Sequence, residues 1–476
     1  MPDLNFLPAV VLAEKIRNKL TSPVEVVEAH LARIERLNPI LNAFVHVESD
    51  AARRAAREAE AMVARGEKIG PLHGIPISIK SAIEVKGMRC EAGTRLRQGI
   101  VAERDAPLVE RLRSAGAIIL GTTNTPELLM AWETDNLLYG RTNNPWDLSR
   151  TAGGSSGGEA AAIASGCSAG GVGSDGGGSI RVPAHFTGIC GLKPTPGRIP
   201  ATGHFPGSVG PFALTGVVGP MARTAADLKV FFEVMQGPDD GDPSAAPVPV
   251  RWPGTQELKN IRIAYFEDDG RTPVTAETRA AVRNAAKLLQ NAGFQVESFR
   301  PEGLEEAREL WWKFFGITGG MLLGPMTEGA ISNDQEEILS PILKEFLGWV
   351  AEGPAHTSQS FLDMWMERDQ VRIKIFEQMK QFPLLLCPAA AIPAFRHGER
   401  SWKIDGKLVK YLDAWSYTEW FNLLGMPAAV VPTGHSPEGL PIGVQIAGKP
   451  WQEELVLSVA AALEDQCGEW KAPREI

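Results

Sequence analysis

GGSSGG at residues 153–158 and GSDGGGSIRVP at residues 173–183 are the segments from which the architecture of this chain is inferred. Each surrounds one serine, Ser155 or Ser179, with glycines, and glycine lets backbone N–H groups approach a reacting atom closely. Glycine clusters are more often turns than catalytic loops, and this chain holds 49 Gly and 35 Pro. Here, however, apolar segments flank both motifs, instead of a low-complexity linker. We therefore interpret the two motifs as parts of one catalytic centre.

A lysine upstream completes the candidate centre. Lys80 ends the apolar run GIPISIK, a context that favours a buried position. A serine hydroxyl needs a base to take its proton at neutral pH, and a lysine is a base only where burial or a nearby cation disfavours its charge. We predict Ser179 as the nucleophile and Lys80 as the base, acting through the hydroxyl of Ser155. The developing oxyanion would be stabilised by the N–H groups of the three glycines before the nucleophile, Gly176, Gly177 and Gly178.

A dinucleotide site is one alternative, because residues 171–176 also fit GxGxxG. Such a site needs a helix that starts at the motif and an acidic residue about 20 positions further on. Pro183 interrupts any helix here, and no Asp or Glu occurs between Asp175 and Asp227. This pattern therefore gives little support to a dinucleotide site.

An α/β-hydrolase-type esterase is a second alternative, because residues 154–158 fit GxSxG. That nucleophile turn follows directly after an apolar strand, whereas residues 143–153 are expected to form a loop. The enzyme would also need a downstream Asp and His, for which Asp413 and His435 are the candidates. Nothing in their local sequence singles them out.

The remaining sequence alternates between helical and strand patterns. We predict two helices within residues 8–38, the second capped by Ser22 and Glu25, and further helices at 50–66, from 125 onward, and at 158–166, 275–292 and 453–463. We predict strands at 77–80, 82–85, 261–267, 294–299, 383–389, 428–434 and 442–448. Residues 107–124 are expected to form a helix followed by a strand. Residues 310–382 are among the least regular, and residues 236–254 are the best candidate for a linker or surface excursion. The alternation favours an α/β fold with a central sheet.

Composition excludes several classes of protein. The 476 residues carry 48 Lys+Arg against 57 Asp+Glu, a net charge of -9 without a basic cluster, which argues against nucleic-acid binding. No apolar run is long enough to span a membrane. The five cysteines lack CxxC spacing, as expected of free thiols in a reducing cytoplasm. The histidines show no metal-ligand spacing, so we expect no metal site.

These motifs, in this order and spacing, resemble the amidase signature family of serine amidohydrolases. The similarity extends over most of the chain, and the segments PTPGRIPATGHFPG and GRTNNPWDL look most like the fatty-acid amide hydrolase 2 branch. The resemblance implies a single domain over residues 1–476, with a mixed central sheet sandwiched by helices. It implies the same roles for Lys80, Ser155 and Ser179, an oxyanion hole from Gly176 to Ser179, and a cis peptide bond before Ser155.

The resemblance also carries expectations about function. It implies cleavage of amide C–N bonds through an acyl-enzyme without metal or cofactor, with Leu129 at the substrate site and with esters and carbamates as plausible further substrates. Aromatic residues in 310–326 predict either an apolar channel or a buried core helix within a variable region 310–382, and the chain could form a homodimer. An amidotransferase A-type subunit, which acts in a tRNA-dependent complex, shares the signature and remains an alternative. Two departures from the family are Ser81, where an Asp is usual, and Gly176, where a bulky apolar residue is common.

Overall fold

The computed structural model describes residues 3–207, 209–332, 338–352 and 357–474. Its centre is an 11-stranded sheet with both parallel and antiparallel neighbours. In spatial order the strands are β1 (Phe44–Val47), β3 (Ile118–Thr123), β2 (Pro76–Lys80), β6 (Gly170–Asp175), β8 (Val217–Ala222), β7 (Cys190–Lys193), β14 (Ala428–His435), β15 (Pro441–Gly448), β11 (Leu384–Pro388), β9 (Arg262–Tyr265) and β10 (Gln295–Ser298). Two small hairpins lie outside this sheet, β4 (Asn143–Asn144) with β5 (Asp147–Thr151) and β12 (Ser401–Ile404) with β13 (Lys407–Lys410).

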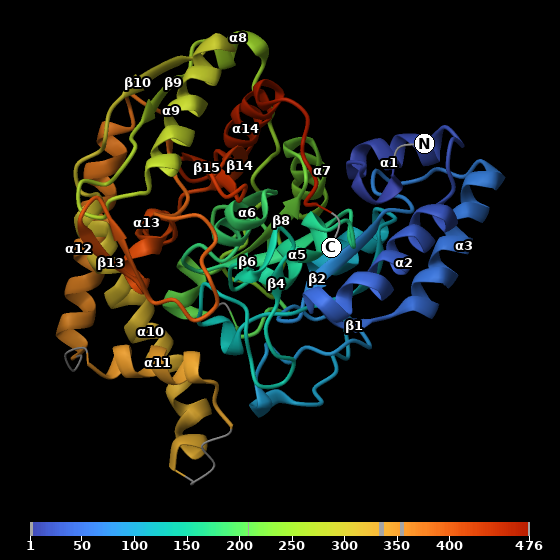
Figure 1. Ribbon diagram of the computed structural model, residues 1–476, viewed down its shortest axis with the longest axis horizontal. Helices are drawn as coiled ribbons and strands as arrows, with labels where there is room; N and C mark the ends of the chain where they lie inside the picture. Colours follow the sequence, from blue (N-terminus) through green and yellow to red (C-terminus); the bar gives the residue numbers. More distant parts are fainter. Residues whose placement is uncertain (1–2, 208, 333–337, 353–356, 475–476) are drawn as a thin grey trace.

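Helices surround the sheet (Figure 1). One group shares a hydrophobic core with the sheet: α1 (Ala9–Arg17), α4 (Pro107–Ser114), α7 (Ala225–Met235), α9 (Ala276–Asn291) and α14 (Glu453–Cys467). The other helices are α2 (Pro23–Leu41), α3 (Ser49–Arg65), α5 (Gly157–Ala164), α6 (Arg181–Thr187), α8 (Thr255–Lys259), α10 (Leu304–Ser332), α11 (Pro341–Ala351), α12 (Ser358–Gln378) and α13 (Ser416–Leu423). In Figure 1, α10 to α12 lie at the opposite end of the molecule from α2 and α3.

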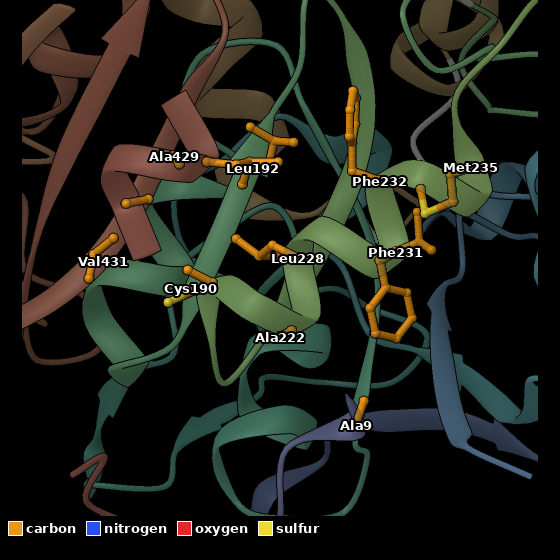
Figure 2. Close-up of a cluster of buried hydrophobic side chains, with 14 of the residues drawn as sticks. Ala9, Cys190, Leu192, Ala222, Leu228, Phe231, Phe232, Met235, Ala429 and Val431 are labelled. Atoms are coloured by element: carbon orange, nitrogen blue, oxygen red, sulfur yellow. The ribbon is translucent and has the colours of Figure 1, made fainter. Parts of the chain in front are cut away.

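The first core is built from apolar side chains that sequence-distant elements contribute. Figure 2 shows Leu228, Phe231 and Phe232 of α7 close to Cys190 and Leu192 of β7. These five residues are completely buried. Fully burying one large apolar side chain contributes roughly 1.5–3 kcal/mol, so this layer holds helices and sheet in a fixed relation.

The same layer determines where Lys80 points. Successive side chains of a strand alternate between the two faces of a sheet. Ile77 and Ile79 of β2 pack in the core with α1, α4 and α7, so Ser78 and Lys80 point to the other face, toward α5. The end of β2 therefore delivers a lysine to the layer that holds both glycine–serine motifs.

Most of the elements expected from the sequence are present, including the capping box of Ser22 and Glu25 at α2. Four expectations were wrong. Residues 82–85 form no strand, residues 143–153 contain the β4–β5 hairpin, the helix expected from residue 125 is a single 3-10 turn, Glu127–Leu129, and the described part of 310–382 is largely helical. Residues 333–337 and 353–356 of that last region lie outside the described residues. A buried helix was one of the two interpretations of residues 310–326, and the full length of α10 was not predicted because it contains several glycines and Pro325, which disfavour helix in isolation.

The Pro- and Gly-rich segment 236–254 lies against the loop at residues 197–202. The Ala246 N–H donates to the carbonyl of Gly197, and the Asp242 carboxylate accepts the Ala201 N–H at 2.9 Å.

None of the described helices is long and apolar enough to cross a membrane.

Candidate active site

Lys80 is completely buried, and its amine contacts three serine hydroxyls. The Nζ atom lies 2.6 Å from Oγ of Ser155 and 3.0 Å from Oγ of both Ser156 and Ser174. Burial lowers the pKa of Lys80 well below its ordinary value. A neutral amine carries two hydrogens and one lone pair, so it can donate to two of these hydroxyls and accept from the third. The arrangement therefore suits a lysine that serves as a base.

A buried acid behind Lys80 is compatible with this neutral state. Glu159 of α5 accepts hydrogen bonds from the hydroxyls of Ser78 and Thr123 at 2.5 and 2.8 Å. Burial raises its pKa to about 8, so the carboxyl is mostly protonated at neutral pH. A protonated acid does not stabilise an ammonium ion as a carboxylate would. Gly171 makes room for it, because a Cβ there would meet Glu159 Oε1 at 2.0 Å.

Ser155 is placed by its backbone. The peptide bond between Gly154 and Ser155 is cis, as the family resemblance implied. The Thr125 hydroxyl donates to the Ser155 carbonyl at 2.7 Å. The next N–H, of Ser156, donates to the carbonyl of Ser179 at 3.1 Å, which ties the two motifs directly to each other.

The turn that carries Ser179 is held by a buried ion pair. The Arg181 guanidinium lies 3.0 Å from the Asp175 carboxylate, and neither side chain is exposed. This carboxylate also accepts the N–H groups of Gly178 at 2.8 Å and Ile180 at 3.0 Å. Arg181 and these N–H donors hold the pKa of Asp175 well below its usual range despite burial. This buried ion pair thus fixes the shape of the glycine turn.

Aromatic side chains hold the carbonyl groups of the same turn. The indole N–H of Trp311 donates to the Gly176 carbonyl at 3.0 Å, and that of Trp132 donates to the Gly177 carbonyl at 2.9 Å. The Gly176 carbonyl and the Gly177 N–H belong to the same trans peptide group and point in opposite directions. Because Trp311 binds this carbonyl, the Gly177 N–H points away from Trp311. Among the described residues, the N–H groups of Gly176, Gly177 and Ser179 have no hydrogen-bond partner.

Both serines line one small cavity of about 30 Å³. Its other lining residues are mostly apolar and include the expected Leu129; the full lining is Leu129, Met130, Ser155, Ser174, Asp175, Gly176, Ser179, His204, Pro206, Phe212, Gly216, Val217 and Phe315. Leu128 and Leu129 have φ angles of 50° and 68°, a left-handed conformation that costs a leucine roughly 1–2 kcal/mol. Strained backbone of this kind clusters at functional sites.

The residues of the two alternative motifs lie elsewhere. The GxGxxG segment forms strand β6 itself, not a turn into a helix, and the side chains of Glu159 and Ser156 fill the space above its glycines. Asp413 forms an ion pair with Arg308, and the ring of His435 packs against that of Trp146 with centroids 5.4 Å apart. Neither belongs to the cavity of Ser155 and Ser179. The structure therefore brings together Lys80 and the two serines, and not the esterase candidates.

Several residues of the site had no signal in the sequence. Trp132 and Trp311 come from segments about 180 positions apart, and their role depends on an indole N–H that only the folded chain brings to the glycine turn. Asn422 of α13 donates to both the carbonyl and the carboxylate of Asp175 at 3.0 Å. Motif reasoning finds glycines and serines in sequence but not the distant side chains that orient them.

Comparison with known proteins places this geometry in a family. The family model described as "Amidase" matches residues 25–457. The chain is 35% identical to an indoleacetamide hydrolase of Bradyrhizobium diazoefficiens, over 97% of this chain and 86% of that protein. It is 32% identical to fatty-acid amide hydrolase 2-A of Danio rerio (99% and 90%), which supports the similarity to that branch. It is 34% identical to the A-type subunit of the glutamyl-tRNA(Gln) amidotransferase of Chloroflexus aurantiacus (100% and 99%).

Solved structures agree with this assignment. A bacterial aryl acylamidase of the amidase signature family superimposes with a TM-score of 0.85 at 28% identity, over 97% of this chain and 96% of that one. A fatty acid amide hydrolase superimposes with a TM-score of 0.86 at 28% identity, over 99% and 87%. The fold is thus the single-domain α/β architecture with a mixed central sheet that the sequence led us to expect. The chain belongs to the amidase family and is a hydrolase that acts on carbon–nitrogen bonds.

Proposed function

We propose that this chain is a serine amidohydrolase that cleaves amides through an acyl-enzyme on Ser179. The observation that carries the proposal is the buried Lys80 amine, 2.6 Å from the hydroxyl of Ser155, which lines the same cavity as Ser179. No hydrogen bond joins the hydroxyls of Ser155 and Ser179 in this structure. Catalytic hydrogen bonds are often long without substrate and tighten when substrate binds.

The reaction starts with a proton relay. Ser155 passes its proton to the neutral Lys80 and takes the proton of Ser179, whose oxygen attacks the amide carbonyl. Ser155 then protonates the leaving nitrogen, which departs as an amine with the electrons of the C–N bond. Water repeats the sequence on the acyl-enzyme and releases the acid. The lowered pKa of Lys80 is what allows the relay to work near neutral pH.

The negative charge of the tetrahedral intermediate needs donors that are not already paired. We assign this role to the N–H groups of Gly176, Gly177 and Ser179. The Gly178 N–H, which we expected from the sequence to be a further donor, instead donates to Asp175 and contributes by shaping the turn. Removing one such donor typically costs about 2.7–4 kcal/mol of transition-state stabilisation.

The substrate class follows from the cavity walls. Leu129, Met130, Phe212 and Phe315 surround the serines with apolar surface, which favours an apolar or aromatic acyl group. The relatives named above include enzymes whose names refer to indoleacetamide, fatty-acid amides and aryl acyl amides. Esters and carbamates offer the same carbonyl, and we expect the enzyme to accept them.

The setting of the enzyme is part of the proposal. All five cysteines are unpaired, and four of them are buried, which supports a reducing, cytoplasmic location. We propose that the chain works without a partner subunit, as a monomer or homodimer. The similarity to an amidotransferase A-type subunit makes a tRNA-dependent complex the competing function.

Labelling with a fluorophosphonate tests the proposal. Intact-mass analysis of the purified wild type is expected to show one adduct, which Ser179→Ala abolishes together with hydrolysis of an aryl amide. Ser155→Ala is expected to slow labelling without abolishing it, because the nucleophile remains but its proton relay does not. Persistent stoichiometric labelling of Ser179→Ala would contradict the assignment of the nucleophile.

A further inference from the structure

The reaction proposed above leaves one side chain of the cavity without a role. His204 lines the cavity together with Ser155 and Ser179. Its Nε2 atom is buried and has no hydrogen-bond partner among the described residues. Buried polar atoms in folded proteins are nearly always paired. An unpaired one at a reaction centre therefore points to a group of the substrate that pairs with it.

The chemistry of this nitrogen is determined by the other side of the ring. Nδ1 of His204 lies 2.9 Å from the carbonyl oxygen of Pro206. A carbonyl oxygen only accepts, so Nδ1 carries the hydrogen and Nε2 presents a lone pair. Burial lowers the pKa of His204 to about 4. The ring is therefore a neutral hydrogen-bond acceptor at neutral pH.

The backbone fixes the ring beside the lysine. His204 forms a β-bridge with Ile83, three residues after Lys80. The Phe205 N–H donates to the Ala82 carbonyl at 2.8 Å, and the Glu84 N–H donates to the Gly203 carbonyl at 2.9 Å. The segment that carries the histidine is thus paired, residue by residue, with the segment that leaves the end of β2.

An amide offers two polar groups, a carbonyl oxygen that accepts and an N–H that donates. The unpaired N–H groups of the glycine turn match the carbonyl oxygen. The carboxylate of Asp175, which also belongs to the cavity lining, is occupied by Arg181 and Gly178. Nε2 of His204 is therefore a side-chain acceptor of the cavity that remains unpaired and can accept the N–H on the leaving side.

We propose that Nε2 of His204 accepts a hydrogen bond from the N–H of the scissile amide and so selects primary and secondary amides over esters and tertiary amides of the same size. This inference rests on the proposed function. As Ser179 attacks, the leaving nitrogen becomes tetrahedral, and the bond to His204 directs its new lone pair toward Ser155. Ser155 gives its proton to that lone pair, the C–N bond breaks with its electrons on nitrogen, and His204 neither gains nor loses a proton.

Three acetyl substrates with the same aromatic ring separate this role from a general one: para-nitroacetanilide, its N-methyl derivative, and para-nitrophenyl acetate. His204→Leu, which removes the acceptor, is expected to lower kcat/KM for the anilide by at least about tenfold while the ester changes by less than about twofold. The preference of the wild type for the anilide over its N-methyl derivative should disappear. His204→Gln, which restores an acceptor oxygen, should recover most of the amide-to-ester ratio.

A matched control is a histidine outside the cavity. His435 is exposed and does not line the cavity of Ser155 and Ser179, so His435→Leu should leave the amide-to-ester ratio unchanged. Equal losses on anilide and ester in His204→Leu, or the same ratio in His204→Leu and His204→Gln, would overturn the proposal. If His204→Leu does not fold, equal turnover of the anilide and its N-methyl derivative by the wild type would overturn it. Fluorophosphonate labelling of each variant reports separately on the nucleophile. Loss of labelling would indicate failure of the proposed function, whereas normal labelling with an unchanged amide-to-ester ratio would indicate failure of the role of His204 alone.

Discussion

At the scale of the single residue, Lys80 connects stability to function. An unfolded lysine has a pKa of about 10.4, whereas burial lowers the pKa in the folded chain. Between these two values the unfolded chain binds a proton that the folded chain does not bind, so this residue makes the protein more stable as pH rises. The residue that supplies the base therefore lowers the free energy of unfolding at neutral pH compared with high pH.

The variant Lys80→Met measures how the contribution of Lys80 to stability changes with pH. The free energy of unfolding of the wild type minus that of the variant is expected to increase with pH from neutral toward pH 10, by at most about 1.4 kcal/mol per pH unit. Urea unfolding at several pH values provides the measurement. Lys68 is exposed, and Lys68→Met serves as the control for the loss of a lysine from the surface. A decreasing difference for Lys80→Met would mean that the folded chain holds this lysine charged.

Lys80, Ser155 and Ser179 could be singled out from the sequence because glycine-rich motifs surround the serines and an apolar run precedes the lysine. The cis peptide bond before Ser155 also agrees with expectation, and the expected Leu129 lines the cavity. The indole donors and the unpaired nitrogen of His204 could not be predicted. Their roles depend on the direction of single N–H groups and lone pairs, which no residue pattern encodes.

At the scale of the element, the glycine turn is defined by crowding. A Cβ added at Gly177 would lie 2.3 Å from the ring of Trp311, whereas one at the exposed Gly348 of α11 would meet nothing within 4 Å. Gly177→Ala is expected to reduce kcat by about 100-fold or more, because the ring or the turn must shift and misplace an oxyanion donor. Gly348→Ala should keep activity and stabilise the protein by about 0.5–1 kcal/mol. Steady-state kinetics and thermal unfolding of both variants test this; a fully active Gly177→Ala would exclude the donor role.

Helix α10 contributes one wall of the cavity that Ser155 and Ser179 line. Phe315 lines the cavity of about 30 Å³ and stacks on Trp311 with ring centroids 4.7 Å apart. Phe315→Ala is expected to raise kcat/KM for amides with bulky aromatic acyl groups relative to acetamide, because it opens the acyl side of the cavity. Its cost in stability should be about 3 kcal/mol.

Phe314 provides the matched control on the same helix. It is buried even more completely than Phe315, and its ring packs against that of Trp365 with centroids 5.1 Å apart, away from the cavity. Phe314→Ala should lose comparable stability without changing the order of substrates. If both variants change the substrate order alike, Phe315 does not act as a wall of the acyl site.

At this scale prediction from sequence was uneven. Amphipathic helices and apolar strands were predicted because their periodicity is visible. Strand β6 was not predicted, and a helix was only one of two interpretations of residues 310–326 in α10, because both elements contain several glycines and glycine weakens the pattern of either structure. Tertiary packing stabilises these elements: β6 is buried along its whole length between β2 and β8.

At the scale of the whole molecule, the sheet joins three remote segments into one site. Lys80 ends β2, Ser155 precedes α5, and Ser179 follows β6. The mixed sheet and its single domain were predicted from family resemblance, since alternation of elements alone indicates only an α/β class. Strand order depends on long-range pairing that sequence periodicity does not specify.

The competing functions differ in what the purified chain does alone. We expect the isolated protein to hydrolyse aryl amides with a turnover that added extract does not increase. Size-exclusion chromatography with light scattering, followed by assay of the peak fraction, measures both oligomeric state and activity. An inactive lone chain that gains glutamine-dependent activity only with partner subunits would favour the amidotransferase alternative.

The most direct test of the central claim is the position of the acyl group during turnover. The enzyme is mixed rapidly with para-nitrophenyl acetate, quenched in acid and digested, and the peptides are analysed by mass spectrometry. We predict one acetyl group on Ser179 of the wild type and none on the same peptide of Ser179→Ala. Acetylation of Ser155 in the wild type, or turnover without any acylated serine, would contradict the account.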